Sequence, residues 1–344
     1  MKKNLIYFLG FVVIAGAAAF LWILFPSKEI RSKKAADTPQ IPEKIINEPV
    51  QPIPLSLSLD EKRVALGRKL FHETQISKNG TVSCATCHDL ALGGTDRRRV
   101  SSGMDGAEGE INSPSVFNSG FNFKQFWDGR AENLEDQIDG PVHNSKEMDA
   151  SDWPDVIARL KANPDYAASF SSLYPEGIGE KSIKDAIATF ERSLYTPNAR
   201  FDKYLQGNAS VITEQEKEGY RLFKDLGCVV CHQGVNVGGN MFQTFGKFGD
   251  YFSDRGHITK ADFGRMNVTG QERDRYKFKV PTLRNVQWTA PYFHDGSAKT
   301  LEEAVRVMAK YQLGLEMSDD EVSAITAFLK TLNGEYEGKP LGKE

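Results

Sequence analysis

The chain has 344 residues, of which 40% are hydrophobic and 26% are charged, and its formal net charge is -3. This balance is ordinary for a globular protein and leaves room for two domains with apolar cores. The sequence has no basic patch, which argues against a nucleic-acid-binding protein.

The N-terminal stretch from Leu5 to Phe25 is apolar and carries no charge. Its length matches the roughly 20 residues that span a bilayer. A cleaved signal peptide is the alternative, but its apolar region usually has only about 7 to 15 residues. We therefore expect residues 1–25 to form an uncleaved transmembrane anchor. Residues 26–55, which contain six prolines among Lys, Glu and Gln, are expected to be an extended Pro-rich linker.

All four cysteines belong to two copies of the pattern Cys-x-x-Cys-His, at Cys84–His88 and Cys228–His232. This is the attachment signature of c-type haem, in which the thiols bind the haem covalently and the histidine ligates the iron. A zinc site would usually bring the two Cys pairs within about 15 to 20 residues of each other, and a dithiol redox motif does not require the histidine. Because c-type haem is attached outside the bacterial cytoplasm, we expect the protein on the periplasmic face of the inner membrane, or free in the periplasm if the N-terminal segment is cleaved.

The remainder of the chain repeats one helical plan. The sequence GRKLF at residues 67–71 is similar to GYRLF at residues 219–223, and each precedes a haem motif. Capping boxes that begin at Ser58, Thr213, Thr300 and Ser318 predict helix starts. The pattern predicts a mainly α fold with two packed cytochrome c-like haem domains, over residues 56–207 and 208–344. A helix with helical apolar spacing is expected near the end of each, with the inward residues Ile183, Ala186, Ile187, Phe190 and Leu194, and Val322, Ile325, Phe328, Leu329 and Leu332.

The sixth ligand of each iron decides what each haem does. A methionine there favours electron transfer, whereas a vacant position lets peroxide or oxygen bind. Met308 is the candidate ligand in the C-terminal half. It shares a helical face with Leu301 and Val305, so a core methionine is the competing interpretation.

From about residue 56 onwards the sequence resembles the bacterial di-haem cytochrome c peroxidases. The resemblance implies an oxidoreductase that reduces hydrogen peroxide to water and so removes it, with two covalent haem c groups and a small cytochrome c or copper protein as electron donor. The motifs that carry it occur in the family's order: residues 84–94 (CATCHDLALGG), 112–118 (NSPSVFN), 125–130 (QFWDGR), 140–142 (GPV), 227–239 (GCVVCHQGVNVGG), 281–286 (PTLRNV), 289–296 (TAPYFHDG) and the helix of Met308.

The resemblance also implies different roles for the two haems. The haem of Cys84, Cys87 and His88 would be the peroxide site, and the haem of Cys228, Cys231 and His232 would receive electrons, with Met308 as its sixth ligand. Trp127 matches a tryptophan between the haems and is expected to relay electrons, although core packing is the simpler alternative.

Three further positions match the family's peroxide pocket. Glu147 falls at its acid/base, Gln137 at the amide that hydrogen-bonds peroxide, and Phe126 at an aromatic that lines the pocket. A carboxylate is wanted there, because peroxide must lose a proton from one oxygen and regain it on the other.

The family carries one calcium ion between its domains, and Asn112, Thr289 and Pro291 fall at the matching positions. Calcium accepts oxygen ligands of this kind, including backbone carbonyls. Family members often form dimers, which makes a homodimer an expectation here as well.

Met104 is a departure from the family. Many members have a histidine at this position, on a loop that caps the peroxide-binding iron in the oxidised protein. A thioether binds ferric iron more weakly than imidazole, so Met104 is at most a weak ligand of the first haem. The glycines around it predict a mobile loop. We expect the oxidised protein to be open at this iron already.

Two other functions remain alternatives. Related di-haem enzymes oxidise a protein partner to mature a tryptophan-derived quinone, but these have tyrosine where Met308 stands. A membrane-tethered electron carrier with two fully ligated haems is the non-enzyme alternative, and it would leave Gln137 and Glu147 without a purpose.

Overall fold

The structure is a computed structural model that describes residues 47–342. The predicted membrane anchor and most of the predicted linker lie outside these residues. Within residues 47–342, no helix is long and apolar enough to cross a membrane.

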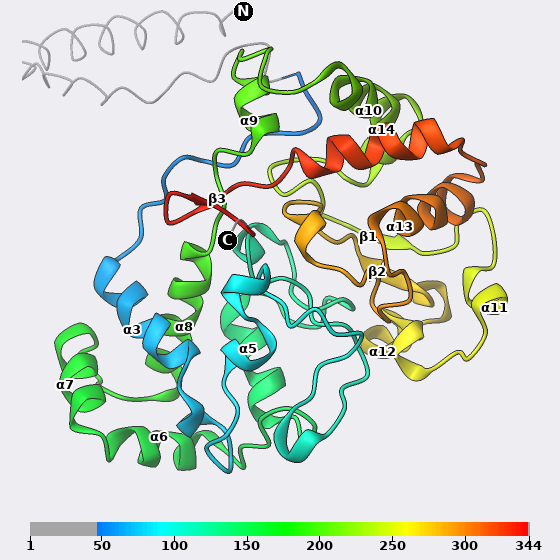
Figure 1. Cartoon of the computed structure of the whole chain (residues 1–344). Coiled ribbons are helices and arrows are strands. Elements are labelled where there is room, and N and C mark those ends of the chain that lie inside the picture. Colours follow the sequence, from blue (N-terminus) through cyan, green and yellow to red (C-terminus); the bar gives the residue numbers. More distant parts are fainter. Residues whose placement is uncertain (1–46, 343–344) are drawn as a thin grey trace, which may run out of the picture. The chain divides into compact units, whose positions relative to one another are not determined.

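The described chain is mainly helical, as predicted, with short turns between the helices and two small antiparallel strand pairs, β1 with β2 and β3 with β4 (Figure 1). The α-helices are α3 (Glu61–Phe71), α4 (Cys84–Cys87), α5 (Leu134–His143), α6 (Trp153–Lys161), α7 (Pro164–Leu173), α8 (Glu180–Ser193), α9 (Arg200–Leu205), α10 (Glu214–Asp225), α11 (Tyr251–Arg255), α12 (Met266–Thr269), α13 (Leu301–Val307) and α14 (Asp319–Lys330). The strands are β1 (Phe242–Thr244), β2 (Lys277–Lys279), β3 (Glu335–Tyr336) and β4 (Lys339–Pro340).

Each half is organised by one close crossing of two helices. A Cβ atom on Gly67 of α3 would lie 1.9 Å from the carbonyl oxygen of Ala186 in α8. A Cβ atom on Gly219 of α10 would lie at the same 1.9 Å from the carbonyl oxygen of Ala324 in α14. Only glycine allows backbones to approach this closely. The predicted repetition is therefore a repetition of the same helix crossing, once for each haem motif.

The predicted apolar faces pack as expected. The inward residues named for α8 and α14 are buried, and they belong to two separate apolar clusters, one for each half. A third, aromatic cluster of Phe245, Tyr251, Phe252 and Phe278 has Trp127 and Met308 packed against it.

Three of the four predicted helix starts are confirmed, since Thr213, Thr300 and Ser318 are N-caps with complete capping boxes. The capping box predicted at Ser58 is wrong. Helix α3 is capped instead by Asp60, whose carboxylate accepts the backbone N–H groups of Lys62 and Arg63. Aspartate is as good an N-cap as serine, and here it lies directly before the first helical residue.

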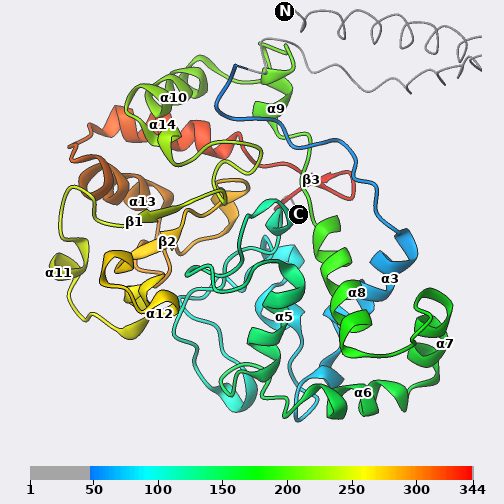
Figure 2. The same cartoon turned by 180° about the vertical axis from the view of Figure 1, so that it is seen from behind.

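The two ends of the described chain cross over between the halves. Val50, within the predicted linker, is fully buried in the C-terminal cluster and forms a parallel bridge with Gly234. At the other end, the Tyr336 ring packs 5.1 Å from the Phe117 ring of the N-terminal half. Figures 1 and 2 show the blue segment reaching the α9–α10 side, while the red β3–β4 hairpin lies towards α3 and α8. Residues 47–53 are thus part of the folded body, and each half is completed by the far end of the sequence.

A buried ion pair holds residues 47–53 against the C-terminal half. The Arg284 guanidinium donates to the Asp202 carboxylate (2.7 Å) and to the backbone oxygen of Gln51 (2.6 Å). The second Asp202 oxygen accepts the N–H of Ile53 (3.3 Å).

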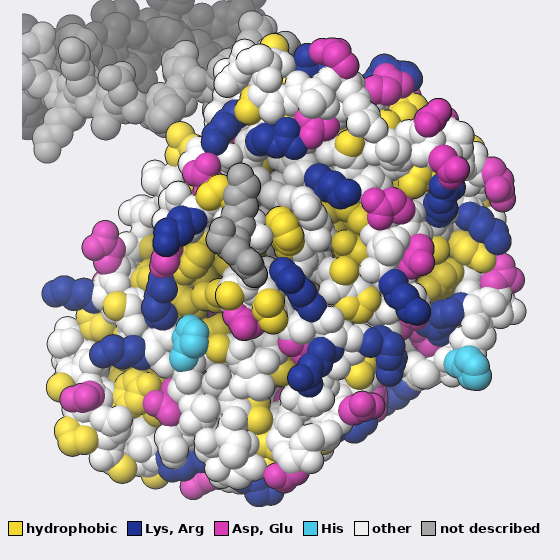
Figure 3. Space-filling view, in the orientation of Figure 1, with side chains coloured by type: hydrophobic (Ala, Val, Ile, Leu, Met, Phe, Trp, Pro, Cys, Tyr) yellow, Lys and Arg dark blue, Asp and Glu magenta, His cyan; other side chains and the backbone are white. Residues whose placement is uncertain are grey.

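Charges on the surface are mixed in sign. On the face in Figure 3, acidic and basic side chains are interspersed.

Candidate active site and haem sites

The two motif histidines are held in the same way. The His88 Nδ1 atom lies 3.2 Å from the Gly94 carbonyl oxygen, and the His232 Nδ1 atom lies 3.4 Å from the Val237 carbonyl oxygen. A carbonyl at Nδ1 fixes the tautomer that leaves Nε2 free to bind a metal. Burial lowers the pKa of His88, and lowers the pKa of His232 to about 4, against the opposing effect of backbone hydrogen bonds. A lowered pKa favours the neutral ring, which is the form that ligates iron.

The C-terminal motif opens into a mostly apolar cavity that fits a haem. Cys228, Cys231 and His232 line it together with Met308, so the predicted ligand set is brought together. Met308 directly follows α13 and begins a π-helical turn over residues 308–313. Such turns are rare and are frequently found at functional sites, and the sequence carried no signal for this one.

The N-terminal motif is accompanied by the predicted peroxide-pocket residues. The Glu147 carboxylate accepts a hydrogen bond from the Asn144 amide (2.7 Å), and its charge acts on the thiols of Cys84 and Cys87. Burial raises the pKa of Glu147, although the Asn144 hydrogen bond and the Arg130 charge oppose it. A carboxylate with a raised pKa exchanges protons more readily near neutral pH, as an acid/base needs to.

Gln137 and Phe126 belong to the same region. Gln137 lies on α5, one turn before Pro141, and Gly140 of that helix packs against the Phe126 ring, 2.6 Å from where a Cβ atom would stand. The Arg130 guanidinium carbon lies 3.5 Å from the centroid of the Phe126 ring. Phe126 adopts a positive φ of 67°, a conformation rare for an aromatic residue. Phe126 therefore packs against the helix that carries Gln137.

An internal repeat shows how the two sites differ. The sequence from Gln125 to His143 aligns without gaps with the sequence from Tyr292 to Lys310, including their β-bridges and their positive-φ Phe and Gly residues. In this alignment Pro141 stands where the C-terminal half has Met308, and Gln137 stands where it has Ala304. Proline has no side-chain donor for iron. The N-terminal half therefore has a polar amide and no ligand at the positions where the C-terminal half has its methionine.

The Met104 loop, which was predicted to be mobile, packs against the segment of Glu147. The Met104 side chain is 6% exposed and belongs to the N-terminal apolar cluster, and its N–H donates to the Glu147 carbonyl oxygen (3.0 Å). A Cβ atom on Gly103 would lie 2.0 Å from the Lys146 carbonyl oxygen. A glycine at position 103 therefore lets the loop pack closely against the segment of Glu147, besides making the backbone more flexible.

Trp127 lies at the junction of the two halves. It lines the C-terminal cavity, and its indole N–H donates to the Asn112 carbonyl oxygen (3.0 Å). Its carbonyl oxygen accepts the Lys279 N–H (2.8 Å), and the Asn112 N–H next to it donates to the His294 carbonyl oxygen (2.7 Å). In the internal repeat Trp127 corresponds to His294, and continuing the same offset pairs Asn112 with Lys279. The two halves thus meet through a reciprocal pair of bonds.

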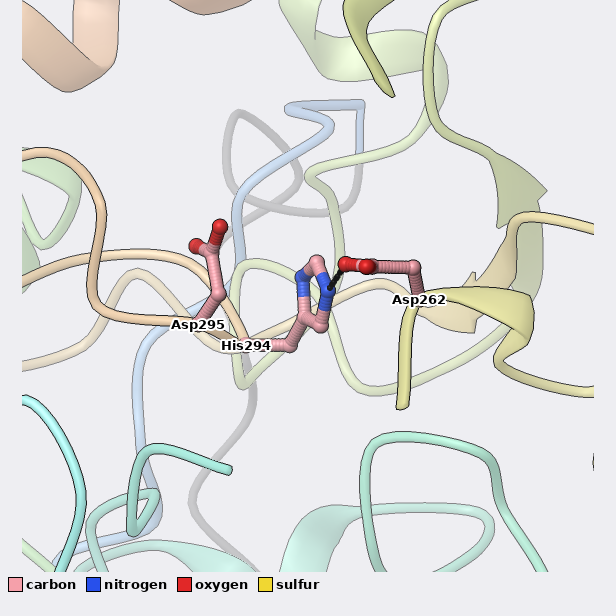
Figure 4. Close-up of side chains that lie close together, drawn as sticks. All are labelled: Asp262, His294 and Asp295. Carbon is pink, nitrogen blue, oxygen red and sulfur yellow. Dashed lines mark hydrogen bonds and ion pairs between the residues drawn. The ribbon is translucent and has the colours of Figure 1, made fainter. Parts of the chain in front are cut away.

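The residues predicted for calcium line one cavity. Asn112, Thr289 and Pro291 are all part of the C-terminal cavity wall. A different group, Asp262, His294 and Asp295, has ligand atoms close enough to share a metal ion (Figure 4). There His294 Nε2 lies 2.7 Å from Asp262, and Arg255 already pairs with both carboxylates. Burial opposes ionisation of Asp262, but the His294 and Arg255 hydrogen bonds hold its pKa below the usual range.

One buried acid was missed by the sequence reasoning. Glu191 lies on the inward face of α8, and its Oε2 atom has no hydrogen-bond partner within the described chain. Burial raises its pKa to about 8, and its charge acts on the Cys84 thiol. Its place between Ile187 and Leu194 on an apolar face was the available signal.

Comparison with known proteins agrees with this geometry. Residues 61–210 match the family described as "Di-haem cytochrome c peroxidase", and residues 216–333 match "Cytochrome c". The chain is 50% identical to the cytochrome c peroxidase Ccp of Escherichia coli, over 84% of this chain and 62% of that protein's length. It is 45% identical to the cytochrome c551 peroxidase of Nitrosomonas europaea, over 84% and 85%. The crystal structure of a MauG-like protein associated with microbial copper homeostasis superposes with a TM-score of 0.74 at 31% identity, over 88% of this chain and 96% of that one.

The fold and the two histidine-centred sites define a c-type cytochrome with two haem c groups and unlike haem environments. The matches are specific enough to name its family. The chain belongs to the di-haem cytochrome c peroxidases.

The oxidised protein tests whether Met104 closes the first site. Since a thioether is a weak ligand for ferric iron, we expect one low-spin six-coordinate haem and one high-spin haem. Electron paramagnetic resonance and visible spectra of the fully oxidised protein check this. Two low-spin six-coordinate haems would show that Met104 or another residue binds the iron.

Proposed function

We propose that the chain reduces hydrogen peroxide to water at the N-terminal site, with electrons that enter at the C-terminal site. The observation that carries the proposal is the contrast between Met308 and Pro141 at equivalent positions of the repeat, together with Gln137 and Glu147 in the N-terminal half. Haem iron, when bound by His88, supplies a centre that binds peroxide and passes electrons to it. Each peroxide takes up two electrons and two protons and leaves as two waters.

Glu147 is the proposed proton carrier. It takes the proton from the peroxide oxygen that binds and returns it to the oxygen that leaves, which makes the leaving group water. Its carboxylate is partly buried and held by the Asn144 amide, so its position is fixed while one oxygen remains available. Fixed acid/base groups of this kind contribute about 10²–10⁴-fold to a rate.

Gln137 and Phe126 are the proposed positioning groups of the pocket. The Gln137 amide offers both a donor and an acceptor to peroxide. Phe126 is held by Gly140 and by Arg130, and its ring supplies an apolar wall that keeps water away from the reacting oxygens. Together they favour peroxide over water in the pocket.

Trp127 is the proposed relay between the haems. It is anchored by hydrogen bonds at its indole nitrogen and its carbonyl oxygen, and it packs against the aromatic cluster that Met308 also touches. A rigid aromatic ring between two redox centres shortens the distance that each electron must cross. The proposed donor is a small cytochrome c or copper protein, which would bind by a small, transient interface.

Calcium is proposed at Asn112, Thr289 and Pro291. These residues come from opposite halves of the sequence and line one cavity wall, which supports a shared site. An ion there would hold Thr289 and Pro291 close to Asn112, whose carbonyl anchors Trp127.

Three further proposals come from the sequence alone. They are location in the periplasm, membrane anchoring through residues 1–25, and formation of a homodimer.

Oxidation of a protein partner is the second candidate. The likeness to a MauG-like structure keeps it open. Met308 argues against it, because the partner-oxidising enzymes that the sequence resembles have tyrosine at that position. The position of Glu147 argues against a di-haem carrier without turnover. Its carboxylate is partly buried and is held by a hydrogen bond from the Asn144 amide.

Replacing Glu147 by Gln tests the proton role. Glu147→Gln keeps the shape and the Asn144 contact but cannot take up a proton, so we expect peroxide turnover to fall about 10²–10⁴-fold. Wild-type turnover should also decline as the pH falls through the raised pKa of Glu147, and the variant should lack this decline. Stopped-flow assays of half-reduced protein measure both. Glu110→Gln, an exposed carboxylate paired with Lys146, is the matched control and should leave turnover unchanged. Equal turnover in Glu147→Gln and wild type would remove Glu147 from the mechanism.

Calcium removal tests the role of the shared site. Chelation should slow electron transfer between the haems, because the Asn112 carbonyl that positions Trp127 loses its fixed neighbours. Rapid reduction of the C-terminal haem, followed spectroscopically until the N-terminal haem responds, gives the rate. Addition of Ca²⁺ should restore it, and a rate that chelation leaves unchanged would exclude the ion from this role.

A further inference from the structure

The cavity of the C-terminal haem motif contains a buried ammonium group without an acidic partner. Lys279 is only 7% exposed and lines the cavity with His232 and Met308. Within the described chain its side chain makes no ion pair, and the cavity wall includes no Asp or Glu. The other cation of the wall, Arg284, is already bound to Asp202 and to backbone oxygens.

The backbone holds Lys279 firmly at this place. It is the last residue of β2, paired with Phe242 of β1, and its N–H donates to the Trp127 carbonyl oxygen. Pro281, two residues later, makes a backbone hydrogen bond with the His232 ring. Lys279 is therefore bonded to Trp127 through its backbone and lines the same cavity as His232.

An isolated buried charge is costly, and proteins normally pair it. Burial alone lowers the pKa of Lys279 to about 8. Haem brings two propionate carboxylates into its cavity, and these are the only anions that the resident cofactor offers. An ammonium and a carboxylate form a strong, charge-assisted hydrogen bond when both are shielded from water.

We propose that the Lys279 ammonium binds a propionate of the C-terminal haem and raises the reduction potential of that haem. The positive charge stabilises the reduced state, which carries one positive charge less at the iron. At an effective dielectric constant of about 20 and a separation of roughly 10 Å, one charge changes the reduction equilibrium on the order of tenfold.

The internal repeat makes the group specific to one site. Asn112 stands where the C-terminal half has Lys279, so the N-terminal half has a neutral amide at the equivalent position. At this position of the repeat, the chain has a cation beside the electron-entry haem and an uncharged amide in the other half. A raised potential at that haem suits a centre that accepts electrons from a donor.

A redox titration in the absence of peroxide tests the proposal on the complete di-haem protein. Lys279→Met should weaken reduction of the Met308-ligated haem about tenfold, a fall of roughly 59 mV for one electron. Lys279→Arg, which keeps the charge, should restore the potential. Lys277→Met is the matched control, because Lys277 lies on the same strand but is already paired with Asp274. An unchanged potential in Lys279→Met would overturn the proposal.

A second measurement keeps the test decisive if Lys279→Met does not fold. Resonance Raman spectra of wild type in H₂O and D₂O should show an isotope shift in the propionate bending band, because the proposed donor is an exchangeable N–H group. Its absence would contradict the contact. The inference rests on haem in the C-terminal site and not on peroxide reduction, so a protein without peroxidase activity could still show both effects.

Discussion

The arrangement of both sites depends on two backbone hydrogen bonds that join the halves of the protein. Asn112 N–H donates to the His294 carbonyl, and Lys279 N–H donates to the Trp127 carbonyl. These bonds relate equivalent positions of the internal repeat, so each half donates one bond to the other. They hold Trp127 against the C-terminal cavity, and they place Asn112 beside residues that come from the far end of the sequence. The two ends of the described chain also join the halves, because Val50 packs in the C-terminal apolar cluster and Leu341 packs in the N-terminal one.

Function arises where the duplicated halves differ. The helix crossing at Gly67 and Gly219, the carbonyl that orients each proximal histidine, and the turn that leads into α5 and α13 are common to both. A few substitutions at equivalent positions then separate the sites: Pro141 for Met308, Gln137 for Ala304, Asn112 for Lys279. In the proposed function, one half thereby has an open iron position with polar groups, and the other has a thioether ligand and a buried cation. Duplication supplies the scaffold, and in the proposed function these differences set the direction of electron flow.

Much of this could be predicted from the sequence, because the relevant signals are local. The haem motifs, the apolar faces of α8 and α14, and the caps at Thr213, Thr300 and Ser318 depend on residues within a few positions of one another. The features that were missed depend on distant contacts. Nothing near Val50 reveals that Gly234 is its partner, and a Lys in the sequence Lys277–Lys279 gives no sign of burial. Asp60 and Ser58 are both good caps, and only the position of the first helical turn chooses between them. The glycines around Met104 predict a mobile loop, and nothing near them in the sequence reveals that Gly103 also allows close packing against Lys146.

The central claim is that the iron next to His88 is accessible while the iron next to His232 is closed. A cyanide titration of half-reduced protein, in which the C-terminal haem is reduced and the N-terminal haem is ferric, tests it most directly. The account predicts one cyanide bound per chain, with spectral changes in the N-terminal haem alone and an unchanged spectrum of the Met308-ligated haem. Absence of binding, or displacement of Met308 by cyanide, would contradict it.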